Sequence, residues 1–182
     1  MNIEIIDQQN YLTTSWSGGS TTQLYILPAG LSVKDDFDLR ISSATVGSGE
    51  SEFSDFSGYK RFLTILQGGM FIKHAHSKEQ YLTRLQPLFF DGATPTYSRA
   101  EQDVVDFNII WKAEHSAPHI AIVQGQQQLV VDGTALFYSC TESLVVVQDQ
   151  EYVLPQGKII KITANNISLK ILGQGIYCAL KA

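Results

Sequence analysis

The chain alternates short apolar runs with turn residues, and this pattern predicts β-strands almost throughout. Gly-Gly, Gly-Ser-Gly, Asp-Gly and Pro-Gln-Gly segments separate the runs, and a helical repeat of apolar residues is hard to find. The predicted strands cover residues 2–6, 23–27, 37–46, 59–66, 70–73, 104–111, 120–124, 128–131, 134–138, 144–148, 158–162, 168–172 and 176–180. The chain is therefore expected to be all-β.

The close succession of these strands also limits their topology. Crossover helices have no room between them, so the sheets are expected to be antiparallel, in a sandwich, a jelly roll or a closed barrel. The strands outnumber those of one small barrel, which favours two barrels, one over residues 1–114 and one over residues 115–182. No linker rich in Pro, Gly or Ser marks the boundary, so the halves are expected to fold as one unit. Asp132-Gly133 is the kind of pair that closes a tight hairpin.

Composition and charge narrow the range of partners. Of 182 residues, 44% are hydrophobic and 17% are charged, which is ordinary for a globular protein. The net charge is -5 and no basic run could neutralise phosphates, so nucleic acid is not an expected partner. No apolar stretch is long enough to span a bilayer and the first residues do not resemble a signal peptide. We therefore expect no membrane association and a cytoplasmic location, where Cys140 and Cys178 stay reduced.

Side-chain alternation along three predicted strands assigns several polar residues to definite faces. Arg40 and Ser42 share one face of the strand at 37–46, and Asp106 and Asn108 share one face of the strand at 104–111. Arg61, in contrast, lies on the largely apolar face of its strand. A guanidinium in that position needs a partner, because an unpaired buried charge is costly.

These polar residues form the candidate binding site. Guanidinium groups can hold a carboxylate through two hydrogen bonds, and an amide can orient the other end of the ligand. We therefore predict a barrel cavity that binds a small-molecule carboxylate and is lined by Arg40, Ser42, Arg61, Asp106 and Asn108. The alternative is structural, with Arg40 or Arg61 paired internally to Asp38 or Asp106.

Several segments of the first two thirds of the chain form a recognisable set by their order and spacing: Trp16-Ser-Gly-Gly-Ser-Thr-Thr22, Leu39-Arg-Ile-Ser-Ser-Ala44, Phe53-Ser54, Arg61, Gly68, Phe90-Asp-Gly92 and Asp106-Phe-Asn108. In these segments the chain resembles the HutD/Ves family. The chain departs from the family pattern at Ser20, Leu39 and Ala93.

The resemblance implies a bicupin, that is, two cupin-type jelly-roll barrels in one chain, with no established catalytic activity. It also implies a regulatory role in histidine utilisation or stress response, exerted through a small acid such as formylglutamate or urocanate. No cofactor is implied, and a homodimer is compatible with this interpretation.

A metal-dependent enzyme is the competing hypothesis. Gly68-x5-His74-Ala-His76-x2-Glu79 comes within one residue of the His-x-His…Glu motif of catalytic cupins, in which two imidazoles and a carboxylate bind iron or manganese. The interval to Glu79 is one residue short, and the segment is equally typical of a polar hairpin tip. A matching fourth histidine is absent near Ile160. The expectation is therefore that the protein binds no metal and acts by binding rather than catalysis.

Overall fold

The computed structural model describes residues 1–181, and β-strands form nearly all of its regular structure. The strands are β1 (Asn2–Ile6), β2 (Leu12–Trp16), β3 (Gly19–Leu27), β4 (Leu39–Val46), β5 (Gly49–Glu52), β6 (Tyr59–Gln67), β7 (Met70–His74), β8 (Gln80–Leu82), β9 (Leu88–Asp91), β10 (Thr96–Ala100), β11 (Val104–Lys112), β12 (His119–Ser139), β13 (Ser143–Val147), β14 (Gln150–Leu154) and β15 (Ile159–Lys181). A single 3-10 turn, η1 (Gln8–Asn10), is the one helical element in this range. None of the described residues forms a helix long and apolar enough to cross a membrane. The all-β prediction is confirmed.

The chain divides into two compact units. One contains residues 11–115, and the other combines residues 1–10 with the chain from Ser116 onward. The sequence pattern had grouped residues 1–10 with the N-terminal barrel, whereas β1 pairs antiparallel with β15. The reason is apolar burial, since Ile6 is buried and Ile3 packs against the core of that second unit.

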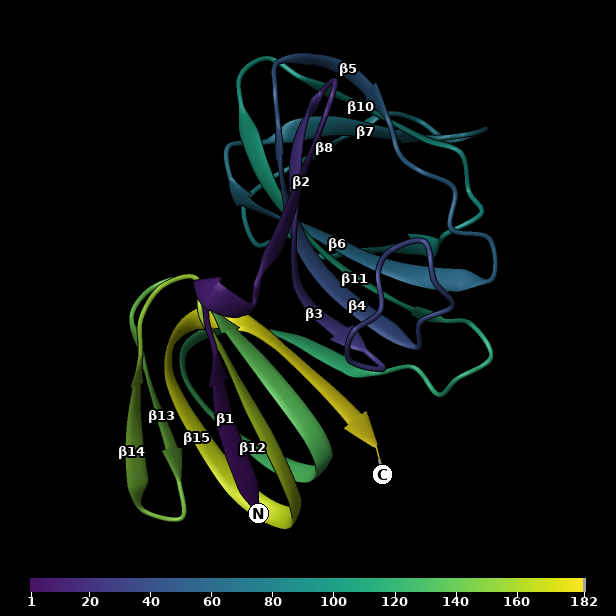
Figure 1. Ribbon diagram of the computed structural model, residues 1–182. Helices are drawn as coiled ribbons and strands as arrows, with labels where there is room; N and C mark the ends of the chain where they lie inside the picture. The colour runs from purple at the N-terminus through teal and green to yellow at the C-terminus, as the bar shows by residue number, and fades with distance from the viewer. Residues whose placement is uncertain (182) are drawn as a thin grey trace. The chain divides into compact units, whose positions relative to one another are not determined.

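The unit of residues 11–115 is built from two sheets that lie on opposite sides of its interior (Figure 1). The first has six strands in the order β2-β3-β4-β11-β6-β9, and the second has four in the order β5-β10-β7-β8. Both sheets contribute to one apolar core, whose fully buried members are Leu63, Ile65, Met70, Ile72, Leu82, Ala100 and Val104. Three buried positions of β6 and β11 on the face that carries this core, Arg61, Asp106 and Asn108, are polar, and they contribute to the site described below.

Two long strands organise the other unit. β12 and β15 appear as long curved green and yellow ribbons in Figure 1, and they pair along most of their length. Asp132-Gly133 was expected to close a hairpin, but β12 continues through it. The register shifts there and Gly133 has a φ of 109°, so the pair bends the strand instead of ending it. Cys140 and Cys178 are buried in this unit and are not joined by a disulfide.

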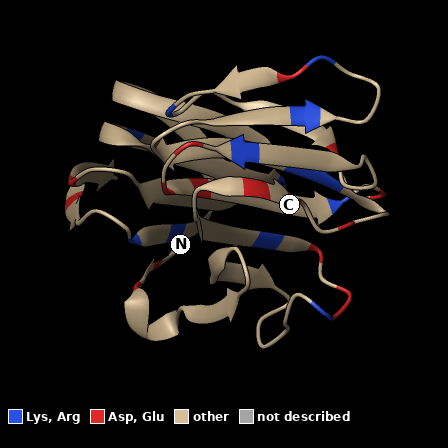
Figure 2. Ribbon diagram, turned by 90° about the horizontal axis from the view of Figure 1, so that it is seen from above, with Lys and Arg blue, Asp and Glu red and all other residues tan. Residues whose placement is uncertain are grey.

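Charged side chains are spread thinly over both units. Figure 2 shows most of the ribbon in tan, with Lys and Arg and with Asp and Glu at separate positions along strands and loops. The buried charges inside residues 11–115 therefore need an explanation of their own, because Asp and Arg are rarely buried without a partner.

Candidate functional site

A polar cluster lies on the inward face of the six-stranded sheet. All five predicted site residues belong to it, each only 3–7% exposed: Arg40, Ser42, Arg61, Asp106 and Asn108. Strand β11 lies between β4 and β6, so Asn108 pairs with Ser42 on one side and with Leu63 on the other. Alternating side chains on three neighbouring antiparallel strands thus bring together residues that are far apart in the sequence.

Arg40 is held by neutral partners. Its Nε donates to Gln23 Oε1 at 2.9 Å, and its Nη1 donates to Ser42 Oγ at 3.2 Å. Burial lowers the Arg40 pKa to about 10, because the charged form loses its hydration. The guanidinium therefore keeps its charge at neutral pH, but at an energetic cost.

Arg61 lies in an aromatic cage. Its Cζ is 4.9 Å from the ring centre of Phe53, 5.3 Å from that of Phe56 and 5.1 Å from that of Phe90. Its Nη2 donates to Asn108 Oδ1 at 2.8 Å and its Nη1 to the Ser54 carbonyl at 3.4 Å. The Nε–H group is buried and contacts no acceptor within residues 1–181. Burial lowers the Arg61 pKa to about 10, with Asp106 opposing the shift and Arg40 adding to it.

Gly92 lets the cage close. A Cβ atom on Gly92 would collide with the carbonyl oxygen of Phe56, so a larger residue would push Phe56 away. The backbones of these two residues are also bonded, since Phe56 N donates to the Gly92 carbonyl at 3.0 Å. The glycine of Phe90-Asp-Gly92 therefore has a physical function in placing the aromatic rings around Arg61.

Asp106 is the one carboxylate in the cluster, and it does not neutralise the arginines directly. Its Oδ1 accepts from Ala44 N at 3.2 Å and from Asn108 Nδ2 at 3.1 Å. Burial raises the Asp106 pKa to about 6, although both hydrogen bonds and the charge of Arg61 oppose the shift. The group is thus ionised only part of the time near pH 6.

The cluster consequently carries excess positive charge. Within the described residues, no ion pair joins Arg40 or Arg61 to a carboxylate, and every hydrogen bond of the two guanidiniums goes to a neutral acceptor. The alternative pairing with Asp38 is not formed, because Asp38 lies 3.7 Å from Lys112 Nζ and 3.9 Å from His115 Nδ1. Two buried guanidiniums thus have one carboxylate near them, and that carboxylate loses its charge as the pH falls through about 6.

The sequence interpretation missed several contributors to the cluster. Gln23 positions Arg40, the three phenylalanines surround Arg61, and His74 stacks on Phe90 with a centroid distance of 4.8 Å. Alternation could have assigned His74 to the inward face that holds Met70 and Ile72. It could not have assigned Gln23, because a register shift between Gln23 and Tyr25 interrupts the alternation of β3. Nothing local to the sequence indicates that their strands lie beside Arg40 and Arg61.

The three residues of the metal hypothesis do not converge. His74 points into the unit from β7, whereas His76 is exposed in the following turn with a φ of 66°. Glu79 is exposed and pairs with Arg99 at 3.4 Å. The described part of the chain contains no group of three or more His, Cys, Asp or Glu side chains arranged to hold a metal ion. The geometry therefore does not favour the enzyme hypothesis.

Cavity size by itself does not locate the site. One surface cavity of about 510 Å³ is lined by Ser48, Gln67, Gly68, Glu101, Gln102 and Asp103, none of which is a predicted site residue. A smaller one of about 280 Å³ includes Arg61 and Phe90 in a wall with Lys60, Phe89, Asp91 and Trp111. The buried charges mark the site better than volume does, because their burial is costly unless they have a role.

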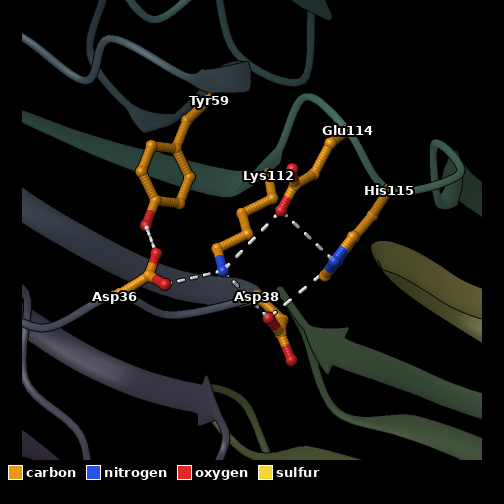
Figure 3. A network of polar contacts seen from close by, with 6 residues as sticks. All are labelled: Asp36, Asp38, Tyr59, Lys112, Glu114 and His115. Carbon is orange, nitrogen blue, oxygen red and sulfur yellow. Dashed lines mark hydrogen bonds and ion pairs between the residues drawn. The ribbon is translucent and has the colours of Figure 1, made fainter.

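A second polar network lies at the surface of the same unit. Figure 3 shows Lys112 Nζ between three carboxylates, at 2.9 Å from Asp36, 3.7 Å from Asp38 and 3.9 Å from Glu114. Tyr59 donates to Asp36 at 3.2 Å, and the hydrogen bond from Lys112 holds the pKa of Asp36 below its usual value. The network ties the 31–38 loop to the end of β11, which is a structural role.

Replacing Lys112 with glutamine should lower the melting temperature, because the three carboxylates then repel one another. The loss should shrink as salt is added, since salt screens exposed charges. Thermal unfolding at low and high sodium chloride measures it. Lys60→Gln, which breaks one exposed pair with Asp91, is the matched control and should show a smaller effect. A salt-independent loss at Lys112 would contradict the electrostatic explanation.

Fold and site together define an all-β cupin protein with a charged interior. The cupin 2 conserved barrel protein of Leptotrichia buccalis has the same fold, with a TM-score of 0.61 at 11% identity over 98% of this chain and 96% of that chain. The family model HutD matches residues 8–179, and the chain belongs to the HutD family.

Two solved structures from Pseudomonas are similar over nearly their whole length. HutD of Pseudomonas fluorescens SBW25, solved in a formate condition, has a TM-score of 0.85 and 25% identity, covering 99% of this chain and 98% of that chain. A conserved protein of unknown function from Pseudomonas aeruginosa PAO1 has a TM-score of 0.84 and 21% identity, covering 98% and 97%. The HutD part of the predicted resemblance is thereby confirmed.

Proposed function

We propose that this HutD-family cupin binds a small carboxylate among Arg40, Arg61 and Asn108, and that binding serves regulation rather than catalysis. The observation that supports the proposal is the excess positive charge of the cluster. Both guanidiniums are buried, and their hydrogen bonds end on neutral acceptors. A carboxylate could accept two hydrogen bonds from a guanidinium and offset the repulsion between the arginines.

The surroundings of Arg61 favour a tight contact with an anion. Three aromatic rings displace water from the guanidinium, and electrostatic attraction is stronger where water is excluded. The unpartnered Nε–H group offers a donor for a ligand oxygen. Asp106 would oppose an anion when ionised, but its pKa of about 6 means that protonation removes this opposition in mildly acidic solution.

Thermal unfolding with added acids tests the proposal. The panel contains formate, formylglutamate and urocanate. The methyl ester of each acid, in which no carboxylate is left, is tested as the uncharged control. An acid at a hundred times its dissociation constant should stabilise the protein by about 2.7 kcal/mol, and the ester should not. The absence of a shift from every acid, or an equal shift from the esters, would contradict carboxylate binding.

The regulatory part of the proposal has a separate test. A stabilising acid is incubated with the protein and then analysed by mass spectrometry. We expect the acid to be recovered unchanged, as a sensor requires. Catalytic turnover of the acid would overturn this part while leaving the binding part intact.

A further inference from the structure

His74 is a half-buried imidazole whose Nε2 atom is shielded from solvent, and the binding proposal leaves its role open. It is the last residue of β7, and its side chain shares the inward face of that strand with Met70 and Ile72. Its ring lies 4.8 Å from the ring of Phe90, and the guanidinium of Arg61 lies 5.1 Å from the same ring. His74 therefore belongs to the same interior as the anion-binding arginine.

Hydrogen bonding determines which nitrogen of His74 carries the proton. Nδ1 lies 2.9 Å from Thr96 Oγ1, and that hydroxyl donates its hydrogen to the Thr94 carbonyl at 2.9 Å. Because a hydroxyl has one hydrogen, Thr96 accepts from Nδ1–H. Burial, together with the charge of Arg61, lowers the His74 pKa, and this shift favours the neutral ring. The remaining nitrogen, Nε2, is then a bare acceptor.

This acceptor is buried and has no donor partner among residues 1–181. A buried acceptor without a donor is costly, so such groups in native proteins call for an explanation. The guanidinium of Arg61 also contacts Phe90, and its Nε–H is a buried donor without an acceptor among the described residues. The interior thus presents one free acceptor and one free donor on two neighbours of the same aromatic ring.

We propose that His74 selects the ligand: besides the carboxylate bound by Arg61, the ligand carries an N–H or O–H group that donates to His74 Nε2. The ligand class is thereby narrowed to acids that carry such a donor, of which hydroxy acids and acids with a secondary amide are the simplest to test. A plain carboxylate would satisfy Arg61 and leave Nε2 unpaired, and this difference is the source of the selectivity. The inference rests on the proposed carboxylate site and adds to it the chemistry of the ligand's second group.

Matched pairs of acids test the selection. Each pair differs in one donor: lactate and propionate, 3-hydroxybutyrate and butyrate, N-acetylglycine and N-acetylsarcosine. In at least one pair, the donor-bearing acid should bind the wild-type protein about tenfold more tightly, as one buried hydrogen bond allows. His74→Phe keeps a ring against Phe90 but has no acceptor, so it should bind both members of that pair equally.

The outcomes separate the two proposals. If acids bind but no pair differs, or if His74→Phe keeps the preference, the selection by His74 is wrong and the carboxylate site stands. If no acid binds, both proposals fail.

The tautomer of His74 has its own test in the wild-type protein without ligand. The nitrogen-15 chemical shifts of the imidazole at pH 7 should show a protonated Nδ1 and an unprotonated Nε2. A proton on Nε2 would overturn the inference.

Discussion

Replacing Arg61 with methionine is expected to remove most of the stabilisation that a small carboxylate gives to the protein. A charged hydrogen-bonding contact contributes roughly 3 kcal/mol, so the dissociation constant should rise roughly a hundredfold. At an acid concentration that adds about 2.7 kcal/mol to the wild type, the variant should gain only about 0.4 kcal/mol. Thermal unfolding or calorimetric titration with the same acid measures the difference.

The ligand-free Arg61→Met protein should remain folded. The Arg61 pKa is lowered from 12.5 to about 10, so burial of the charged guanidinium lowers the free energy of unfolding by roughly 3 kcal/mol. Methionine relieves that cost but leaves Asn108 Oδ1 without its donor, which costs about 1–3 kcal/mol. The two effects nearly cancel, so the free energy of unfolding should change by less than about 2 kcal/mol.

Arg99→Met is the matched control for this substitution. Arg99 lies on the outward side of the four-stranded sheet, where it stacks 4.1 Å from Phe71 and pairs with Glu79. Its replacement should leave the response to acids unchanged. A structural role for Arg61 would give the reverse pattern, with a large fall in melting temperature and an undiminished response to acids.

Asp106→Asn should abolish a pH dependence of stability that the wild type shows between about pH 4 and pH 6. The folded pKa of Asp106, about 6, lies above its usual value of 3.8, so within this window the folded state holds a proton that the unfolded state has released. Wild-type stability therefore falls as the pH rises through the window, by up to about 3 kcal/mol in total. Both hydrogen bonds to Asp106 end on Oδ1, which asparagine can retain.

Urea denaturation at several pH values measures this difference, and the variant should be the more stable protein at pH 7. It should also bind carboxylates more tightly there, because the negative charge near Arg61 is gone. Asp91→Asn is a control of opposite sign, since the hydrogen bond from Lys60 lowers the Asp91 pKa and its stabilisation is lost as the pH falls. Parallel pH curves for wild type and Asp106→Asn would contradict the buried-carboxylate explanation.

The candidate site could be predicted in part from the sequence. Alternation placed Arg40 with Ser42 and Asp106 with Asn108, and burial on one inward face agrees with both groupings. The same rule indicated that Arg61 lies on an apolar face, where it is found among three phenylalanines. The neutral partners of the arginines could not be predicted, because the hydrogen bond from Arg40 to Gln23 joins residues of different strands.

Local patterns in the amino-acid sequence were enough to assign the all-β class and the strand faces of the five predicted site residues. Both follow from local rules, since turn residues end strands and successive side chains alternate in direction. The tertiary structure alone decided that β11 lies between β4 and β6, that β1 pairs with β15, and that His74 reaches Phe90. Strand order and register depend on contacts between distant segments, and only the folded chain brings those segments together.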